Sequence, residues 1–372
     1  MIASRGRGRR ILSAVVSLLA VLLPALAAGS GIDAAPRASE VTLLGVAADD
    51  PNGLDGGPAS LFARAMLDPD AAADPSLLPD AVPAARLSSM LAIFACSGLL
   101  YVAVALSRGR AVAMLSCIGL ALLPPVALEG SILRAELPCT VFGLLALLML
   151  IGLPEALRAR RRRRRIHAAA SLVAIGLAVA IADALAVATM PHYGVYLLVP
   201  AGCLLLVVGG ETSRFFAVLR RFRLLVLPFR AFTRRLWPWV VPPLAGILFS
   251  LWLLRSTSGP ELPTRMQFGL LPESWPLLAI VVSLAVVGLV VRGVALLTDL
   301  LRGRSVTAAT VLAVHGTVLL GQRFGMSATD DALPAAPALA LWIGEGARVA
   351  LWYGSAKLSG LPRRAADLPS RG

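Results

Sequence analysis

The sequence predicts an all-α polytopic membrane protein with about ten transmembrane helices and both termini in the cytoplasm. Of its 372 residues, 58% are hydrophobic and 15% are charged. A soluble domain of this length cannot bury so much apolar surface, whereas a bilayer accepts it. Ten apolar stretches divide the chain, several of them short for a span, and the segments between them alternate between arginine-rich and acidic.

The distribution of charge predicts the orientation of the spans. With a cytoplasmic N-terminus, 26 of the 35 basic residues fall in cytoplasmic segments, and 15 of the 21 acidic residues fall outside. This is the positive-inside bias of membrane proteins. It explains the net charge of +14 without nucleic acid as a partner. We therefore expect a multi-pass protein of the bacterial inner (cytoplasmic) membrane, with membrane lipids as its surroundings.

The first apolar run, within residues 1–28, is either a signal anchor that serves as the first span or a cleaved secretory signal. Four arginines precede it, and Ala25-Leu26-Ala27 resembles a cleavage motif. The many spans that follow favour the uncleaved anchor. The next segment, 29–87, is rich in Asp, Pro, Ala and Gly and is predicted to be an extracytoplasmic acidic loop.

Residues 88–354 are predicted to form a transmembrane bundle with basic cytoplasmic loops, followed by a cytoplasmic tail at 355–372. The run 158–165 reads as a topology anchor against anionic headgroups. The segment 212–235 mixes aromatic residues with arginines, which favours an interfacial helix on the cytoplasmic leaflet. The predicted spans lie near 88–106, 111–128, 138–156, 168–189, 195–210, 237–254, 276–298, 306–321 and 335–354.

Motifs for several other function classes are missing from the sequence. It contains no Gly-rich phosphate loop and no His/Cys cluster, which argues against a nucleotide-driven pump. Its four cysteines all lie in apolar stretches without metal-type spacing, and they are interpreted as small apolar side chains.

Short polar motifs occur in a definite order on the predicted outer side. Each is a default functional candidate, because charge at the edge of an apolar core is costly. In chain order they are Asp55 ahead of Ala63-Arg64-Ala65-Met66-Leu67, then Arg86-Leu87 at the opening of a span that carries Tyr101, then Arg134 and Glu136 in the second outer loop, and finally Arg323 ahead of Leu333-Pro334 and Pro337.

This order resembles that of the glycosyltransferase C superfamily, the membrane glycosyltransferases of the protein-mannosyltransferase and aminoarabinose-transferase type. The resemblance implies transfer of a sugar from a polyprenyl-phosphate donor to an extracytoplasmic glycan, lipid or protein acceptor. It implies that Asp55 is the catalytic carboxylate that deprotonates the acceptor hydroxyl. Asp49 or Asp50 would take this role if the alignment is displaced by a few residues.

The resemblance also implies a substrate-binding set of Arg134, Arg323, Arg86 and Tyr101. Arginines at the outer surface would hold the leaving phosphate and neutralise its developing charge. Glu136 would orient Arg134 or bind the acceptor. No cofactor is required, although a divalent metal between Asp55 and Glu136 remains an alternative.

Two other function classes stay open. Gly56 stands where the family has a second acid, and the first outer loop is short, as in a non-catalytic relative. A transporter of lipids or small solutes would have two similar halves around a midplane site. The enzyme hypothesis requires Asp55, Arg134 and Arg323 to meet at one outer-face cavity.

Overall fold

The regular structure of the chain is helical wherever it is described. The computed structural model describes residues 2–49, 75–127, 130–131, 137–145, 278–301 and 336–358, and the single positions 148, 178, 181, 182 and 185. Every regular element in these ranges is a helix, in agreement with the predicted all-α class. Outside the described residues lie the predicted spans near 195–210, 237–254 and 306–321, the run 158–165 and the interfacial helix at 212–235.

Two described helical stretches, Ile11–Gly29 and Leu78–Arg108, are long and apolar enough to cross a membrane. Arg110–Leu122 and Ala279–Ala295 are apolar but shorter. Many large apolar side chains on α1 (Ile2–Gly29) and α12 (Leu278–Leu301) are exposed, which suits helices that face lipid. These features support membrane association.

The centre of the described fold is a helical hairpin, formed by α5 (Leu78–Arg108) and α6 (Arg110–Leu122). Gly109 separates the two helices at a φ of 90°, and its N–H bonds to the carbonyl of Ala105. Glycine adopts this left-handed conformation at no steric cost, so it can end one helix and admit the next. After Leu122 the two prolines of the short α7 (Pro124–Ala127) end the α6 hydrogen-bond ladder.

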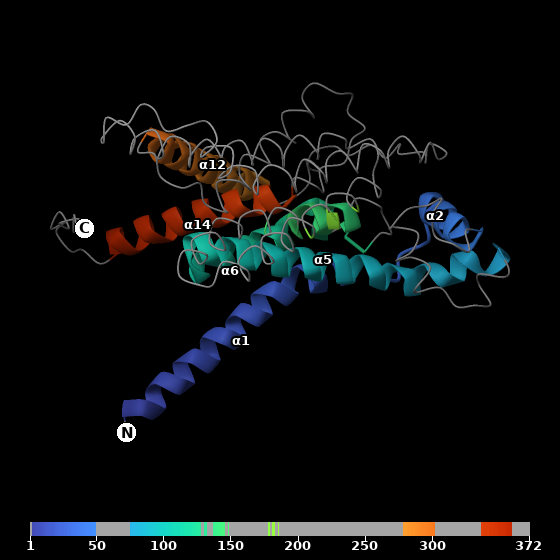
Figure 1. The fold of residues 1–372 in the computed structure, drawn as a ribbon, viewed down its shortest axis with the longest axis horizontal. Helices are drawn as coiled ribbons and strands as arrows, with labels where there is room; N and C mark the ends of the chain where they lie inside the picture. The colour runs from blue at the N-terminus through green and yellow to red at the C-terminus, as the bar shows by residue number, and fades with distance from the viewer. Residues whose placement is uncertain are drawn as a thin grey trace, which may run out of the picture.

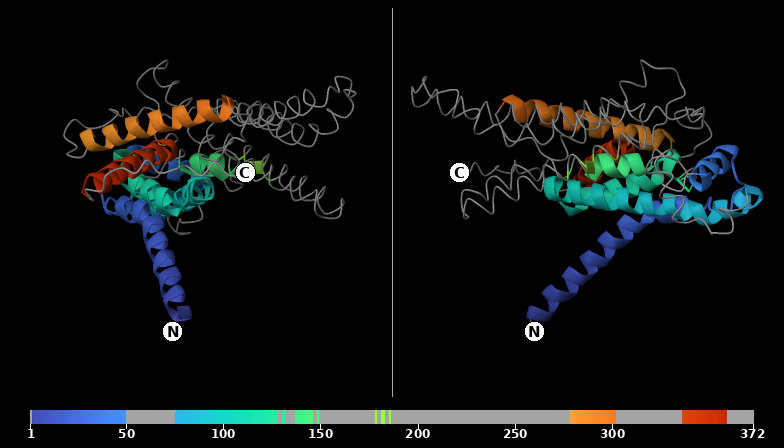
Figure 2. Two further views of the ribbon diagram at one scale, coloured as in Figure 1. Left: turned by 90° about the vertical axis from the view of Figure 1, so that its left-hand side faces the viewer. Right: turned by 45° about the vertical axis from the view of Figure 1, so that its right-hand side comes forward.

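Two further helices pack on this hairpin and enclose the main core. α1 packs on both α5 and α6, and α14 (Ala336–Leu358) lies along α6. α12 packs on α14 on the side away from α1 (Figures 1 and 2). The buried core between these helices includes Ala25, Ala28, Leu100, Val104, Val112, Ala113, Leu120, Leu341 and Ile343.

Glycines bring α12 and α14 unusually close. A Cβ on Gly288 of α12 would overlap the carbonyl oxygen of Trp342, and a Cβ on Gly346 of α14 would overlap that of Leu284. The contact is reciprocal, since each glycine meets a carbonyl of the facing helix. Small residues allow such backbone contact between helices in membranes, where burial of apolar area provides little attraction.

The helix α5 begins well before the predicted span at 88–106. Its first turns are amphipathic, and Leu78, Val82 and Ala85 bury against Leu43 and Leu44 of α2 (Ala38–Asp49). Hydropathy identifies the long apolar stretch but misses such an extension, because exposed residues, Asp80 among them, lower its mean hydropathy. The predicted acidic loop therefore contains structure: α2, the 3-10 turn η1 (Pro75–Leu77) and the start of α5.

Candidate functional site

Two members of the predicted substrate-binding set are described, Tyr101 and Arg86, and Arg86 lies close to the beginning of α5. Its side chain is 1% exposed and forms an ion pair with Glu40 of α2, which is fully buried. The guanidinium Nε donates to Oε1 of Glu40 at 2.9 Å, and Nη2 donates to Oε2 at 2.6 Å. This bidentate contact is the strong form of an arginine–carboxylate pair.

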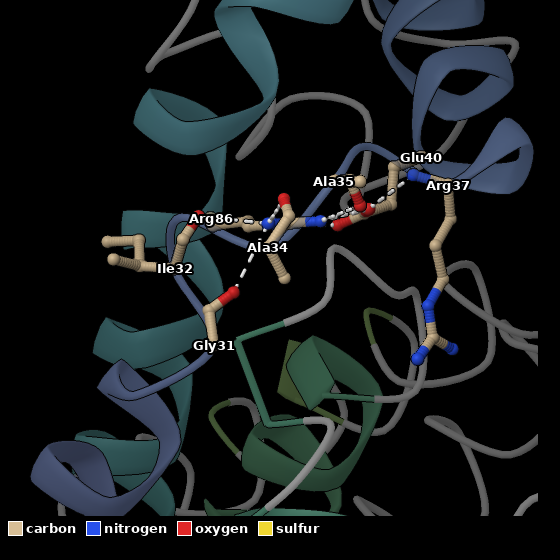
Figure 3. Close-up of polar contacts among 7 residues, drawn as sticks. All are labelled: Gly31, Ile32, Ala34, Ala35, Arg37, Glu40 and Arg86. Carbon is tan, nitrogen blue, oxygen red and sulfur yellow. Dashed lines mark hydrogen bonds and ion pairs between the residues drawn. The ribbon is translucent and has the colours of Figure 1, made fainter.

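Arg86 also binds the backbone that follows α1 (Figure 3). Its Nη1 group donates to the carbonyls of Gly31 and Ile32 at 3.2 and 2.9 Å and to that of Ala34 at 2.6 Å. Its Nη2 group also donates to the carbonyl of Ala35 at 3.2 Å. All five N–H bonds of the guanidinium therefore have acceptors within the chain, which compensates the cost of burying the charge.

Glu40 has a second role at the start of α2. Its Oε2 accepts a hydrogen bond from the backbone N–H of Arg37 at 3.0 Å. A glutamate in the first turn that reaches back to the N–H ahead of the helix is one half of a capping box. We call Arg86, Glu40 and the turn 31–35 the outer latch, because together they fasten α1, α2 and α5 to one another on the side that the charge distribution predicts to be extracytoplasmic.

The outer latch changes the interpretation of Arg86. The sequence places this arginine at the mouth of a span, where it was expected to contact substrate. In the structure its N–H donors bind the chain itself. Arg86 therefore joins α2 and α5, the helices that precede and follow the acidic segment. Both residues were visible in the sequence, Glu40 in the first turn of a helix and Arg86 at the start of a span. They are 46 residues apart, so local spacing could not show that they pair.

Tyr101, the other described member of the predicted set, lies in the middle of α5 and is half-buried. Its hydroxyl donates to the Ser17 Oγ of α1 at 2.8 Å, and Ser17 Oγ in turn bonds to the carbonyl of Ser13 at 2.8 Å. This contact links the two helices that are apolar enough to span a membrane. The remaining predicted site residues lie outside the described residues: Asp50, Asp55, Arg134, Glu136 and Arg323.

A second charged cluster lies at the other end of α5. Glu345 of α14 is 1% exposed, and its carboxylate accepts from Arg108 Nε at 2.5 Å and from Arg108 Nη2 at 3.2 Å. Arg292 of α12 approaches the same carboxylate, with Nε 3.4 Å from Oε1. Helical spacing favours a pair between Glu345 and Arg348, but the structure joins Glu345 to arginines of two other helices.

No group of three metal-ligating side chains occurs within the part of the chain that the structure describes. The metal site considered between Asp55 and Glu136 lies outside it. No family model, curated protein or solved structure matches this chain.

Proposed function

We propose that the chain is a membrane glycosyltransferase that moves a sugar from a polyprenyl-phosphate donor to an acceptor on the extracytoplasmic side. We further propose the ten-span topology with both termini in the cytoplasm, which places the outer latch outside. The observation that carries the proposal is the anchoring of the segment that contains Asp55. This segment leaves the end of α2 at Asp49 and rejoins the chain at η1, just ahead of α5.

The outer latch supports this proposal because it fixes both ends of that segment. Arg86 on α5 holds Glu40 on α2 through a buried bidentate pair, and the satellite core of Leu43, Leu44 and Val82 packs beneath it. A catalytic carboxylate must be held at a defined distance from the reacting carbon. A segment whose two ends are both held by the outer latch is suited to that demand.

The proposed reaction is a single displacement at the anomeric carbon. The acceptor oxygen forms a bond to this carbon, and the bond from the carbon to the phosphate oxygen of the donor breaks. The acceptor proton passes to the Asp55 carboxylate as general base. The polyprenyl phosphate leaves with the bonding electrons, and Arg134 and Arg323 neutralise its charge. Glu136 orients Arg134, and the step needs no cofactor.

The test measures transfer of labelled sugar from a panel of polyprenyl-phosphate sugars by purified protein. Asp55→Asn keeps the size of the side chain but removes the base, so turnover should fall by about 100-fold or more. Asp80→Asn is the matched control, because Asp80 is an exposed acid at the start of α5 in the same outer segment. Activity of Asp55→Asn equal to that of Asp80→Asn would overturn the role of Asp55. If wild-type protein neither transfers sugar from any donor nor is thermally stabilised by any donor, the glycosyltransferase proposal is overturned.

A further inference from the structure

The cluster around Glu345 carries more positive than negative charge. Arg108 and Arg292 contact its carboxylate, Arg348 follows it by three residues on α14, and Arg110 follows Arg108 across the Gly109 turn. Four arginines against one glutamate leave an excess of three positive charges among these five side chains. An anion is the natural counter-charge for such a cluster.

The geometry of Arg108 leaves part of its guanidinium facing away from Glu345. Its Nε and Nη2 atoms bind the carboxylate, so this edge of the fork is occupied. Its Nη1 atom makes no hydrogen bond to any residue that the structure describes. The side chain is 27% exposed, whereas Glu345 is 1% exposed. Glu345 therefore orients Arg108 from the buried side, and the Nη1 edge of the guanidinium is left available for a ligand.

Two further arginines of the cluster are exposed. Arg110 opens α6, where Gly109 provides no side-chain cap, so the helix dipole adds to its positive charge. Arg348 is exposed on α14, on the side of the helix that also carries Glu345. Within the described ranges, no acidic side chain other than Glu345 is bonded to these arginines.

The surroundings of the cluster indicate a lipid rather than a soluble anion. The last turns of α14 expose Leu351, Trp352 and Tyr353, and the two rings lie edge to face with centroids 6.1 Å apart. Tryptophan and tyrosine concentrate at membrane interfaces, where headgroups lie. The arginine distribution predicts that this end of α5 is cytoplasmic, and basic pockets between helices on that side bind anionic headgroups.

We propose that Arg108, Arg110 and Arg348 form a binding site for the phosphate of an anionic phospholipid in the cytoplasmic leaflet. Glu345 positions Arg108 in this site, and Arg292 of α12 also approaches the Glu345 carboxylate. The site lies at the other end of α5 from the outer latch. It is independent of the proposed sugar transfer, and it would exist equally in a transporter or a non-catalytic protein.

The test measures binding of short-chain phosphatidylglycerol to the full-length protein in neutral detergent, by native mass spectrometry and by thermal unfolding. Phosphatidylcholine is the uncharged comparison, and inorganic phosphate at the same concentration is the soluble one. We expect wild-type protein to bind phosphatidylglycerol at least tenfold more tightly than phosphatidylcholine. We expect inorganic phosphate to leave the melting temperature unchanged.

Arg110→Gln and Arg348→Gln should each weaken phosphatidylglycerol binding about fivefold. Both side chains are exposed, so neither change should alter the melting temperature without lipid. Arg37→Gln, on the outer side of the protein, is the control for loss of one charge and should bind like wild type. Unchanged binding by both variants, or no preference over phosphatidylcholine, would overturn the proposal. Equal stabilisation by inorganic phosphate would assign the cluster to a soluble anion and overturn the lipid site.

Discussion

Arg86 and Arg108 lie on the same helix, and each pairs with a glutamate from another segment. The α5 residues between them extend for about 33 Å, close to the thickness of about 30 Å of a bilayer hydrocarbon core. Each pair fastens α5 to a different partner helix: Glu40 belongs to α2 and Glu345 to α14. The two ion pairs therefore hold α5 near its two ends, and its apolar middle packs against α1 and α6.

The outer latch should contribute strongly to stability. Glu40→Gln leaves the buried Arg86 with a neutral partner, and removal of one charge from a buried pair typically costs about 3 kcal/mol or more. Thermal unfolding in detergent should show a clear decrease in melting temperature. Asp33→Asn, which changes an exposed acid in the adjacent turn, should have little effect. Equal melting temperatures for the two variants would contradict the buried latch.

The close contact between α12 and α14 should depend on Gly288. Gly288→Ala places a methyl group against the Trp342 carbonyl and should destabilise the protein by about 1–3 kcal/mol. Gly293→Ala lies on the same helix with nothing within 4 Å of the new methyl, so it is the matched control and should be neutral or slightly stabilising. The difference in melting temperature between these two variants checks the contact, and its absence would exclude this packing.

The contact between α1 and α5 should appear as a coupling between Tyr101 and Ser17. Tyr101→Phe and Ser17→Ala each remove one partner of the 2.8 Å hydrogen bond. In membrane proteins such bonds contribute about 0.6 kcal/mol on average. A double-mutant cycle on unfolding free energy measures the coupling. Strictly additive single changes would mean that the two hydroxyls do not interact.

The first helix should remain in the mature protein. Ala20 and Ala25 of α1 are buried, Ala25 in the main core, and Ser17 of α1 accepts the hydrogen bond from Tyr101 on α5. Cleavage after Ala27 would remove both sets of contacts from the fold. The intact mass of the membrane-extracted protein should therefore include α1. A purified form that begins at Ala28 would show that this helix is a signal.

The sequence predicted the helical class and the approximate positions of five described helices, two of which are long and apolar enough to cross a membrane, because hydropathy reports directly on apolar stretches. Helices lie at 2–29, 78–108, 110–122, 278–301 and 336–358, and each coincides with a predicted apolar run or extends it. The extension of α5 to Leu78 was missed because amphipathic turns carry a weak hydropathy signal. Its burial depends on α2, which is separate in sequence.

The partners of the charged residues could not be predicted from spacing. Arg348 is the local candidate for Glu345, but the partners are Arg108 and Arg292, which reach it from other helices. Likewise, nothing close in sequence connects Arg86 with Glu40. A single sequence shows which charges lie near apolar segments, but tertiary packing decides which of them meet. The grouping of Asp55, Arg134 and Arg323 stays a prediction for the same reason.

The sequence separation within the two ion pairs sets an order of events during synthesis. Glu40 precedes Arg86 by 46 residues, so Glu40 has already been made when Arg86 emerges from the ribosome. Arg108 precedes Glu345 by 237 residues. At a synthesis rate of about 5–20 residues per second, Arg108 waits for roughly 10–50 s before its carboxylate exists. The ion pair at the Arg86 end of α5 can therefore form early, whereas the ion pair at the Arg108 end can form only when α14 has been made.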